Sequence, residues 1–164
     1  MLARLTFNYD PLVAEILDNL PEDLIINGTV LDPAMGGGQI VKEVERRKRA
    51  AGKTDAEIRA TVFGMESNVM RRDYAVNKHH LVGTYTAEDF LTIDISKLKV
   101  DLVVMNSPYT NGQVMTYTKF FERALDVGNL VASIMPVDLQ SRHDKLRFHN
   151  QRVLKHNTYI SDSV

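Results

Sequence analysis

A short strand-like stretch that runs into three consecutive glycines constrains the fold of this chain more than any other feature. Residues 29–32 read Thr-Val-Leu-Asp, Pro33 follows, residues 36–38 are all glycine, and a helix-permitting segment begins at Gln39. This order predicts a buried strand, a tight turn and a helix whose first turn is open. Because glycine has no Cβ, the backbone of such a turn can adopt positive φ and a ligand can approach it closely.

The predicted turn has the charge pattern of a site for a ligand that carries both an ammonium and a carboxylate group. Free N–H groups at a helix N-terminus favour a carboxylate or a phosphate. Asp32 adds a negative charge at the carboxyl end of the strand, which suits an ammonium group. The alternative is a structural strand-to-helix turn that binds no ligand.

The same residues resemble a motif of a known enzyme family. Residues 32–38 read Asp-Pro-Ala-Met-Gly-Gly-Gly, which resembles the Asp-Pro-Ala-Cys-Gly-Ser-Gly motif of S-adenosylmethionine-dependent amino-methyltransferases, a group that includes the adenine-N6 DNA methyltransferases. Met35 stands where cysteine is common, and Gly37 where serine is common. The resemblance implies that the methionine end of S-adenosylmethionine is held by Asp32, Pro33, Ala34, Met35, Gly36 and Gly38.

Two further stretches match this family in its order of motifs. Residues 7–11, Phe-Asn-Tyr-Asp-Pro, resemble the Phe-Tyr-Thr-Pro stretch that precedes the glycine motif, which implies that Tyr9 closes over the cofactor. After a short strand at 84–86, the family has an acidic residue, followed by an aromatic one, that contacts the adenine amino group. The best match is Asp89, with Phe90 stacking beside it. The alternative for Asp89 is a solvated loop residue.

A second strand is predicted over residues 61–66 and ends in Glu66. In nucleotide-binding α/β sheets, an acidic residue at this position bonds the ribose hydroxyl groups. An ordinary acidic loop residue is the alternative. The pattern is not that of a nicotinamide enzyme, because Val41 occupies the third glycine position of G-x-G-x-x-G.

The strongest strand is predicted over residues 100–105, an apolar run interrupted by one aspartate. Such runs are typical of central parallel strands that are covered on both faces. The strand is followed directly by Asn106, Ser107, Pro108 and Tyr109. Because ligands bind beyond the carboxyl ends of the strands in such sheets, we expect this tetrad to lie over the same crevice as the glycine turn.

The tetrad resembles Asn-Pro-Pro-Tyr, the catalytic motif of enzymes that methylate an amide-like or aromatic amino group. The lone pair of such a nitrogen is delocalised, and two acceptors placed on its N–H bonds restore its nucleophilicity. The implied acceptors are the side-chain oxygen of Asn106 and the main-chain oxygen of Ser107, which replaces the first proline of the motif. Pro108 restricts Ser107 to extended conformations. Tyr109 offers a flat face on which a target base can stack.

Composition excludes several other classes. With 164 residues and a net charge of −1, the chain fits one ordinary globular domain without an overall charge that attracts nucleic acid. It has no cysteine, which excludes disulfides and thiolate metal sites and fits a reducing cytoplasm. No apolar run approaches the ~20 residues of a membrane helix, and no signal peptide is recognised. The pair His79 and His80 lacks helical metal-binding spacing, so no metal is predicted.

We therefore predict an α/β, doubly wound, mostly parallel sheet, a Rossmann-like methyltransferase fold, in a single cofactor-binding and catalytic domain over residues 1–164. Its strands are expected near residues 29–32, 61–66, 84–86, 100–105, 130–135 and 158–161. Its helices are expected near residues 11–20, 39–51, 55–59, 68–78, 117–126 and 143–154. The resembling enzymes continue with further strands and a target-recognition domain. We expect those C-terminal strands to be incomplete here and the recognition domain to be absent.

The predicted function is S-adenosylmethionine-dependent methylation of an exocyclic amino group, with adenine N6 in DNA as the target and restriction–modification as the setting. One alternative is methylation of an RNA base or a protein glutamine amide. Another is a catalytically weak binding or regulatory module that keeps the fold. Expected partners are DNA and a further chain or domain that supplies target recognition. Basic residues at 46–49 and 142–156 are either solvated surfaces or contacts to DNA phosphates.

Overall fold

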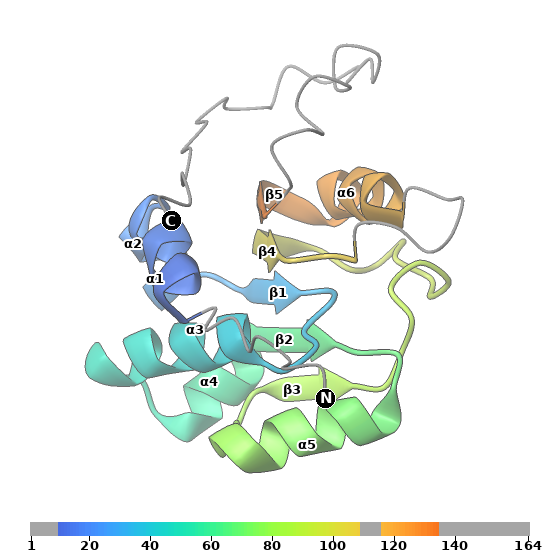
Figure 1. Cartoon of the computed structure of the whole chain (residues 1–164). Helices are drawn as coiled ribbons and strands as arrows, with labels where there is room; N and C mark the ends of the chain where they lie inside the picture. The colour runs from blue at the N-terminus through green and yellow to red at the C-terminus, as the bar shows by residue number, and fades with distance from the viewer. Residues whose placement is uncertain (1–9, 109–115, 135–164) are drawn as a thin grey trace, which may run out of the picture. The chain divides into compact units, whose positions relative to one another are not determined.

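The computed structural model describes residues 10–108 and 116–134, which form a parallel sheet with helices on both faces (Figure 1). The strands are β1 Val30–Asp32, β2 Val62–Met65, β3 Thr84–Thr86, β4 Val100–Met105 and β5 Gly128–Ser133. The helices are α1 Asp10–Asp18, α2 Glu22–Ile26, α3 Gln39–Ala50, α4 Asp55–Thr61, α5 Val69–His79 and α6 Thr116–Val127. No helix among these residues is long and apolar enough to cross a membrane.

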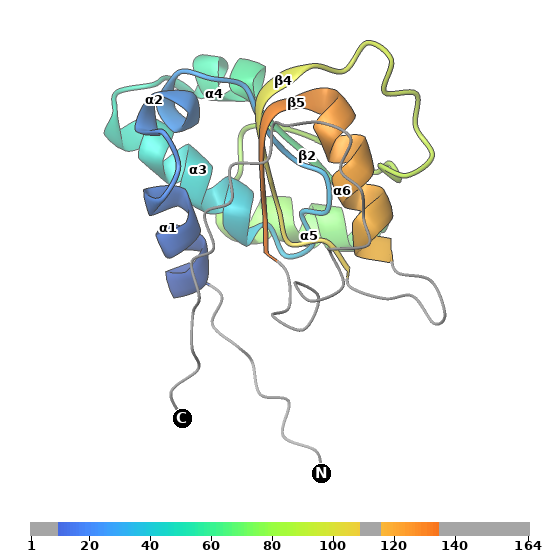
Figure 2. The ribbon, with the colours of Figure 1, turned by 90° about the horizontal axis from the view of Figure 1, so that it is seen from above.

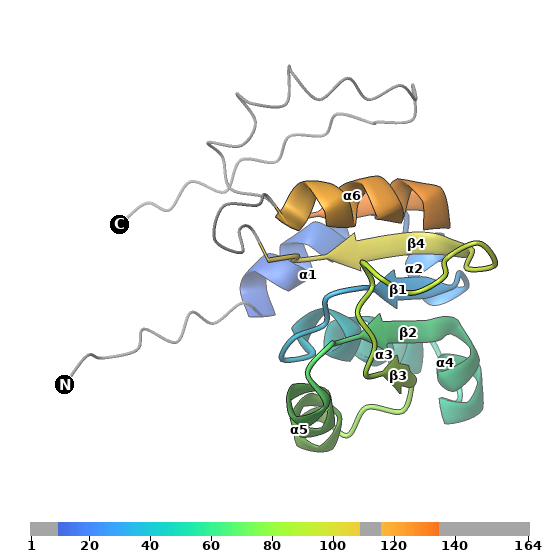
Figure 3. The same ribbon diagram turned by 90° about the vertical axis from the view of Figure 1, so that its right-hand side faces the viewer.

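The sheet is doubly wound, as predicted. Its strand order is β3-β2-β1-β4-β5, and every neighbouring pair is parallel. The chain therefore moves outward from β1 to β3, returns to the centre at β4 and moves outward again to β5. Figure 3 shows four of these strands stacked in the order β4, β1, β2, β3. The strand expected at 158–161 and the helix expected at 143–154 lie outside the described residues.

Seen from above, helices lie on both sides of the sheet (Figure 2). The apolar side chains of the strands alternate between two cores, one on each face. Val30, Leu102 and Val104 belong to the core that helices α1 to α5 cover. Val103 and Met105 belong to the second core, which α6 and the segment 87–99 cover. This double burial explains the continuous apolar run of β4, since neither face of the strand meets water.

The one aspartate in β4 fastens that strand to the start of β1. The carboxylate of Asp101 accepts hydrogen bonds from the backbone N–H and the hydroxyl of Thr29, each at 2.8 Å. In return, the N–H of Asp101 donates to the Thr29 hydroxyl at 2.9 Å and to the Thr29 carbonyl at 3.1 Å. We call this set of bonds the Thr29–Asp101 bracket. It joins the two central strands at the amino edge of the sheet.

Two local features differ from the sequence-based expectation. The helix expected near residues 11–20 ends at Asp18, and a second helix, α2, follows with Pro21 as its N-cap residue. Proline suits the first positions of a helix because the N–H that it lacks has no helical partner there. The strand expected near residues 130–135 begins earlier, at Gly128, which pairs with Val100. A Cβ at Gly128 would lie 2.7 Å from a methyl group of Val103, so the close packing of β5 on β4 requires the glycine.

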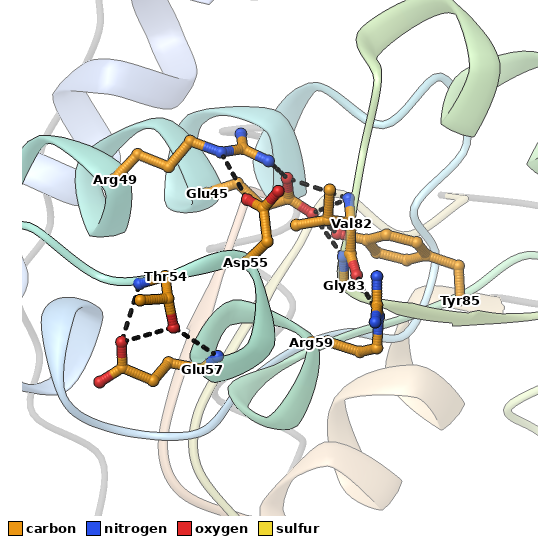
Figure 4. A network of polar contacts seen from close by, with 9 residues as sticks. All are labelled: Glu45, Arg49, Thr54, Asp55, Glu57, Arg59, Val82, Gly83 and Tyr85. Carbon is orange, nitrogen blue, oxygen red and sulfur yellow. Dashed lines mark hydrogen bonds and ion pairs between the residues drawn. The ribbon is translucent and has the colours of Figure 1, made fainter.

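A buried acidic residue of α3 organises the edge of the sheet around β3 (Figure 4). The carboxylate of Glu45 accepts hydrogen bonds from the N–H groups of Val82 and Gly83 and from the hydroxyl of Tyr85. It also forms an ion pair with Arg49 at 2.9 Å. Burial and this hydrogen bond to Glu45 raise the pKa of the Tyr85 hydroxyl far above its usual range. These bonds hold Val82 and Gly83, the two residues before β3, against α3.

Tyr85→Phe tests the strength of this network. The substitution leaves one hydrogen-bond site of a fully buried carboxylate unfilled, so we expect the free energy of unfolding to fall by about 1.5–3 kcal/mol. Urea denaturation at neutral pH measures the change. Tyr74→Phe is the matched control. Because the side chain of Tyr74 is 61% exposed on α5, the free energy of unfolding of this variant should hardly change. Equal values for the two variants would contradict the role of the Glu45 contact.

Candidate functional site

Two predicted motifs meet at the centre of the sheet. The glycine turn follows β1, the tetrad follows β4, and β1 pairs directly with β4 through Val30 with Leu102 and Leu31 with Val103. The strand order also reverses between β1 and β4. In open α/β sheets, ligands bind beyond the carboxyl ends of the strands at such a reversal. The structure thus brings the two motifs to the edge where the fold class places its ligands.

The glycine turn has the backbone conformation that its sequence predicts. Gly36 and Gly38 have φ values of 50° and 81°, in the region that favours glycine. The N–H of Met35 donates to the carbonyl of Met65 at 2.9 Å, and the N–H of Gly38 donates to the carbonyl of Met35 at 2.7 Å. Gly38 then serves as the N-cap of α3 without any side-chain hydrogen bond to the helix. The first turn of α3 therefore keeps N–H groups that no side-chain cap occupies.

Gly37 and Gly38 differ in how closely other atoms approach them. A Cβ at Gly38 would lie 3.2 Å from the Cβ of Ala75, so the turn packs against α5. A Cβ at Gly37 would meet only the flexible end of the Gln39 side chain, at 2.8 Å. Serine, which is common at this position in the resembling family, would therefore displace a side chain and not the backbone.

Asp32 is a buried carboxylate at the start of this turn. It is 1% exposed, and its Oδ1 accepts a hydrogen bond from the N–H of Ala34 at 3.0 Å. Burial raises the pKa of Asp32 to about 7, the N–H of Ala34 lowers it, and the charge of Glu66 raises it. In the part of the chain that the structure describes, no cationic side chain pairs with this carboxylate, which suits a ligand that brings a cation.

Glu66 lies at the end of β2 and is held by the start of α5. Its Oε1 accepts a hydrogen bond from the N–H of Asn68 at 2.9 Å, and its Oε2 lies 3.6 Å from Arg71. Its backbone N–H donates to the carbonyl of Thr86, which ties the ends of β2 and β3 together. The bond from the N–H of Met35 to the carbonyl of Met65, the residue before Glu66, brings the end of β2 next to the glycine turn. A role in binding a ribose stays a prediction.

Of the two residues after β3 that were predicted to contact the adenine, one lies at the surface and the other in the core. Asp89 is exposed, and its Oδ1 accepts a hydrogen bond from the N–H of Leu91 at 2.9 Å. The ring of Phe90 is 1% exposed and stacks on Phe120 at a centroid distance of 5.7 Å. Arg123 lies over the same ring and donates to the Phe90 carbonyl at 2.8 Å. Phe90 is thus a core residue in this structure, and its stacking on a cofactor stays a prediction.

The tetrad is described only in part. Asn106 is half-buried, Ser107 is 1% exposed, and Pro108 is exposed. The hydroxyl of Ser107 is buried without a hydrogen-bond partner among the described residues. Tyr109, like Tyr9, lies outside the described residues. The carbonyl of Met105, directly before Asn106, accepts a hydrogen bond from the N–H of Ile134 at 2.9 Å.

One contact at the glycine turn was not predicted from the sequence. Nε2 of His79, the last residue of α5, lies 3.1 Å from the carbonyl oxygen of Gly37. The sequence offered no signal for this contact, because 42 residues separate the two positions. In residues 10–108 and 116–134, no group of three histidine, aspartate or glutamate side chains is placed to hold a metal ion.

A separate cavity of about 540 Å³ lies between α1, α2 and α3. Leu17, Leu20 and Ile25 contribute apolar walls, and Arg47 on its rim is paired with Asp18 at 2.7 Å. None of the predicted site residues lines it. We therefore assign it no part in the candidate site.

Comparison with known proteins identifies solved structures of similar fold. No protein-family model and no curated protein sequence matches the chain. Solved structures do match. A candidate RNA methyltransferase from Pyrococcus horikoshii superposes with a TM-score of 0.62 at 15% identity, over 83% of this chain and 66% of that protein.

Two further solved structures extend the likeness. The M protein of the type I restriction enzyme EcoKI has a TM-score of 0.58 at 18% identity, over 74% of this chain and 31% of its own. A plantazolicin methyltransferase, solved with SAH, has a TM-score of 0.54 at 11% identity, over 90% of this chain and 55% of its own. This chain thus spans two thirds or less of each protein. The described part of the chain has the Rossmann-like fold that these methyltransferases share.

Proposed function

We propose that this chain binds S-adenosylmethionine at the carboxyl edge of β1 and β4 and directs its methyl group to an exocyclic amino group, adenine N6 in DNA being the first target to test. The observation that carries the proposal is the direct pairing of β1 with β4. This pairing puts the glycine turn and Asn106 at the ends of neighbouring strands, about 5 Å apart in a sheet.

The residues at the edge fit the methionine end of this cofactor. The uncapped first turn of α3 offers N–H groups to a carboxylate. Asp32 is a buried carboxylate with a raised pKa, and an ammonium group beside it would stabilise its ionised form. Glu66 would accept hydrogen bonds from the ribose hydroxyls, and Asp89 one from the adenine amino group. When bound, S-adenosylmethionine supplies an electrophilic methyl group.

The tetrad would prepare the nitrogen that receives this methyl group. Asn106 Oδ1 and the main-chain oxygen of Ser107 would each accept a hydrogen bond from the target amino group and so restore its lone pair. Pro108 disfavours helical conformations at Ser107, which would fix the direction of that oxygen. Positioning of this kind accounts for roughly 7–11 kcal/mol of a barrier in well-oriented systems. No general base is needed before transfer, because the nitrogen releases its proton after it becomes cationic.

The choice of DNA as substrate rests on the resemblance of the motifs and on the likeness to a restriction-enzyme M protein. A base in duplex DNA would have to be flipped out of the helix, at a cost of a few kcal/mol. An RNA base is the second candidate, because the P. horikoshii protein is a candidate RNA methyltransferase. We propose, as a further expectation, that another chain or domain supplies target recognition.

Calorimetric titration with S-adenosylmethionine tests the cofactor, and transfer of a labelled methyl group tests the substrate. We expect saturable heat for the wild-type chain, and label on an adenine-containing DNA in preference to an RNA or a glutamine peptide. A folded chain, verified by circular dichroism, that gives no heat would overturn the enzyme proposal and favour a module that only keeps the fold. Heat together with label only on RNA would overturn the choice of DNA.

A further inference from the structure

The glycine turn depends on neighbouring elements for its shape, because three consecutive glycines have little conformational preference of their own. Within the turn, the N–H of Gly38 donates to the carbonyl of Met35. This bond fixes one side of the peptide group between Gly37 and Gly38. The other side of the same peptide group, the Gly37 carbonyl, faces α5.

The end of α5 supplies the contact to that carbonyl. His79 Nε2 lies 3.1 Å from the oxygen of Gly37, and since a carbonyl oxygen only accepts, Nε2 carries the hydrogen. The His79 ring also borders Gly38, whose added Cβ would lie 3.5 Å from Cδ2 of the ring. The absence of a side chain at Gly38 is what lets α5 approach the turn so closely.

Termination of α5 directly after His79 fixes where this ring lies. His80 adopts a left-handed conformation with φ of 51° and caps the helix. The N–H of the next residue, Leu81, donates back to the carbonyl of Val76 at 3.1 Å. This closure is a standard helix ending, and it holds the last turn of α5 in place.

We infer that His79 is a positioning residue for the cofactor turn: it holds the Gly37 carbonyl and so sets the backbone that the turn presents to its ligand before the ligand arrives. This inference rests on the proposed function in so far as the ligand is S-adenosylmethionine. Without His79, ligand binding would have to order the glycines. Because one hydrogen bond is involved, we expect the cofactor Kd to rise about two- to tenfold.

Three variants test the inference. His79→Leu removes the donor at similar volume, and His79→Gln restores an N–H donor near the position of Nε2. His80→Asn is the matched control, because asparagine also tolerates the left-handed conformation of this cap residue and so leaves the His79 contact intact. The measurements are hydrogen exchange at the amide of Gly38 in the cofactor-free protein, the ¹⁵N shifts of the His79 ring, the Kd for S-adenosylmethionine and the melting temperature.

We expect faster exchange at Gly38 and weaker cofactor binding for His79→Leu, rescue of both by His79→Gln, and neither change for His80→Asn. The ring shifts should report a protonated Nε2. A His79→Leu variant with a lower melting temperature but unchanged Gly38 exchange and Kd would overturn the inference and leave a purely structural role. If the wild-type chain binds no cofactor at all, the proposed function fails, and the exchange result alone still decides whether His79 orders the turn.

Discussion

Replacing Asp32 with asparagine is expected to stabilise the cofactor-free protein at pH 8 and to weaken binding of S-adenosylmethionine at least tenfold. Asparagine keeps the oxygen that accepts from the N–H of Ala34 but does not ionise. Burial raises the pKa of Asp32 from 3.8 to about 7. Below about pH 4 the carboxyl group is protonated in both the folded and the unfolded protein. As the pH rises from about 4 to about 7, ionisation favours the unfolded protein and the free energy of unfolding falls. The loss amounts to about 4 kcal/mol at most.

Urea denaturation from pH 4 to pH 8 measures this effect, and calorimetry at pH 8 measures the cofactor Kd. The wild-type and Asp32→Asn proteins should have similar stability at pH 4 and diverge as the pH rises. Asp101→Asn is the control of opposite sign, because the backbone N–H and hydroxyl of Thr29 lower the pKa of Asp101. The stability that Asp101 provides is therefore lost as the pH falls. If the free energy of unfolding has the same pH dependence in Asp32→Asn and wild type, ionisation of Asp32 does not destabilise the protein and the prediction is wrong.

Replacing Asn106 with alanine is expected to reduce the rate of methyl transfer by about 10²–10³-fold, as the loss of one preorganised polar group at a reacting centre does in other enzymes. The cofactor Kd should change little, because Asn106 would contact the target amino group and not the cofactor. Single-turnover transfer of a labelled methyl group to DNA gives the rate, and calorimetry gives the Kd.

Asn129→Ala is the control for this prediction. Asn129 lies on the neighbouring strand β5, and its side chain contacts Asp101 near the amino edge of the sheet. Its removal should leave the transfer rate within about twofold of wild type, as for a surface substitution away from the site. If Asn106→Ala retains the full rate, the proposed polarisation of the amino group by its side chain is wrong.

The central strands and the glycine turn could be predicted because their own residues favour one local structure without help from distant contacts. The apolar run of β4 fits only a strand that is buried on both faces, and its bounds were predicted to the residue. Consecutive glycines after a strand predict a turn with positive φ, because glycine reaches that region without steric cost, and Gly36 and Gly38 have such φ values. The adjacency of the turn and the tetrad then follows from the strand order of the fold class.

The remaining features depend on contacts between residues that lie far apart in sequence. Glu45 looks like any acidic residue on a helix, yet it is fully buried because two N–H groups before β3 and the hydroxyl of Tyr85 surround it. Phe90 could not be separated from a surface aromatic without knowing that Phe120 and Arg123 cover it. His79 carried no pattern at all, because its partner is a main-chain oxygen.

The Thr29–Asp101 bracket also has a kinetic consequence. It closes a loop of 72 residues, whereas β1, β2 and β3 follow one another along the chain and pair over much shorter separations. Closing a long loop costs more chain entropy, so long-range pairings form late during folding. The half of the sheet from β1 to β3 is therefore expected to assemble first, and the docking of β4 would complete the binding edge in the last step. Substitutions at Thr29 should then mainly speed unfolding and leave early compaction intact.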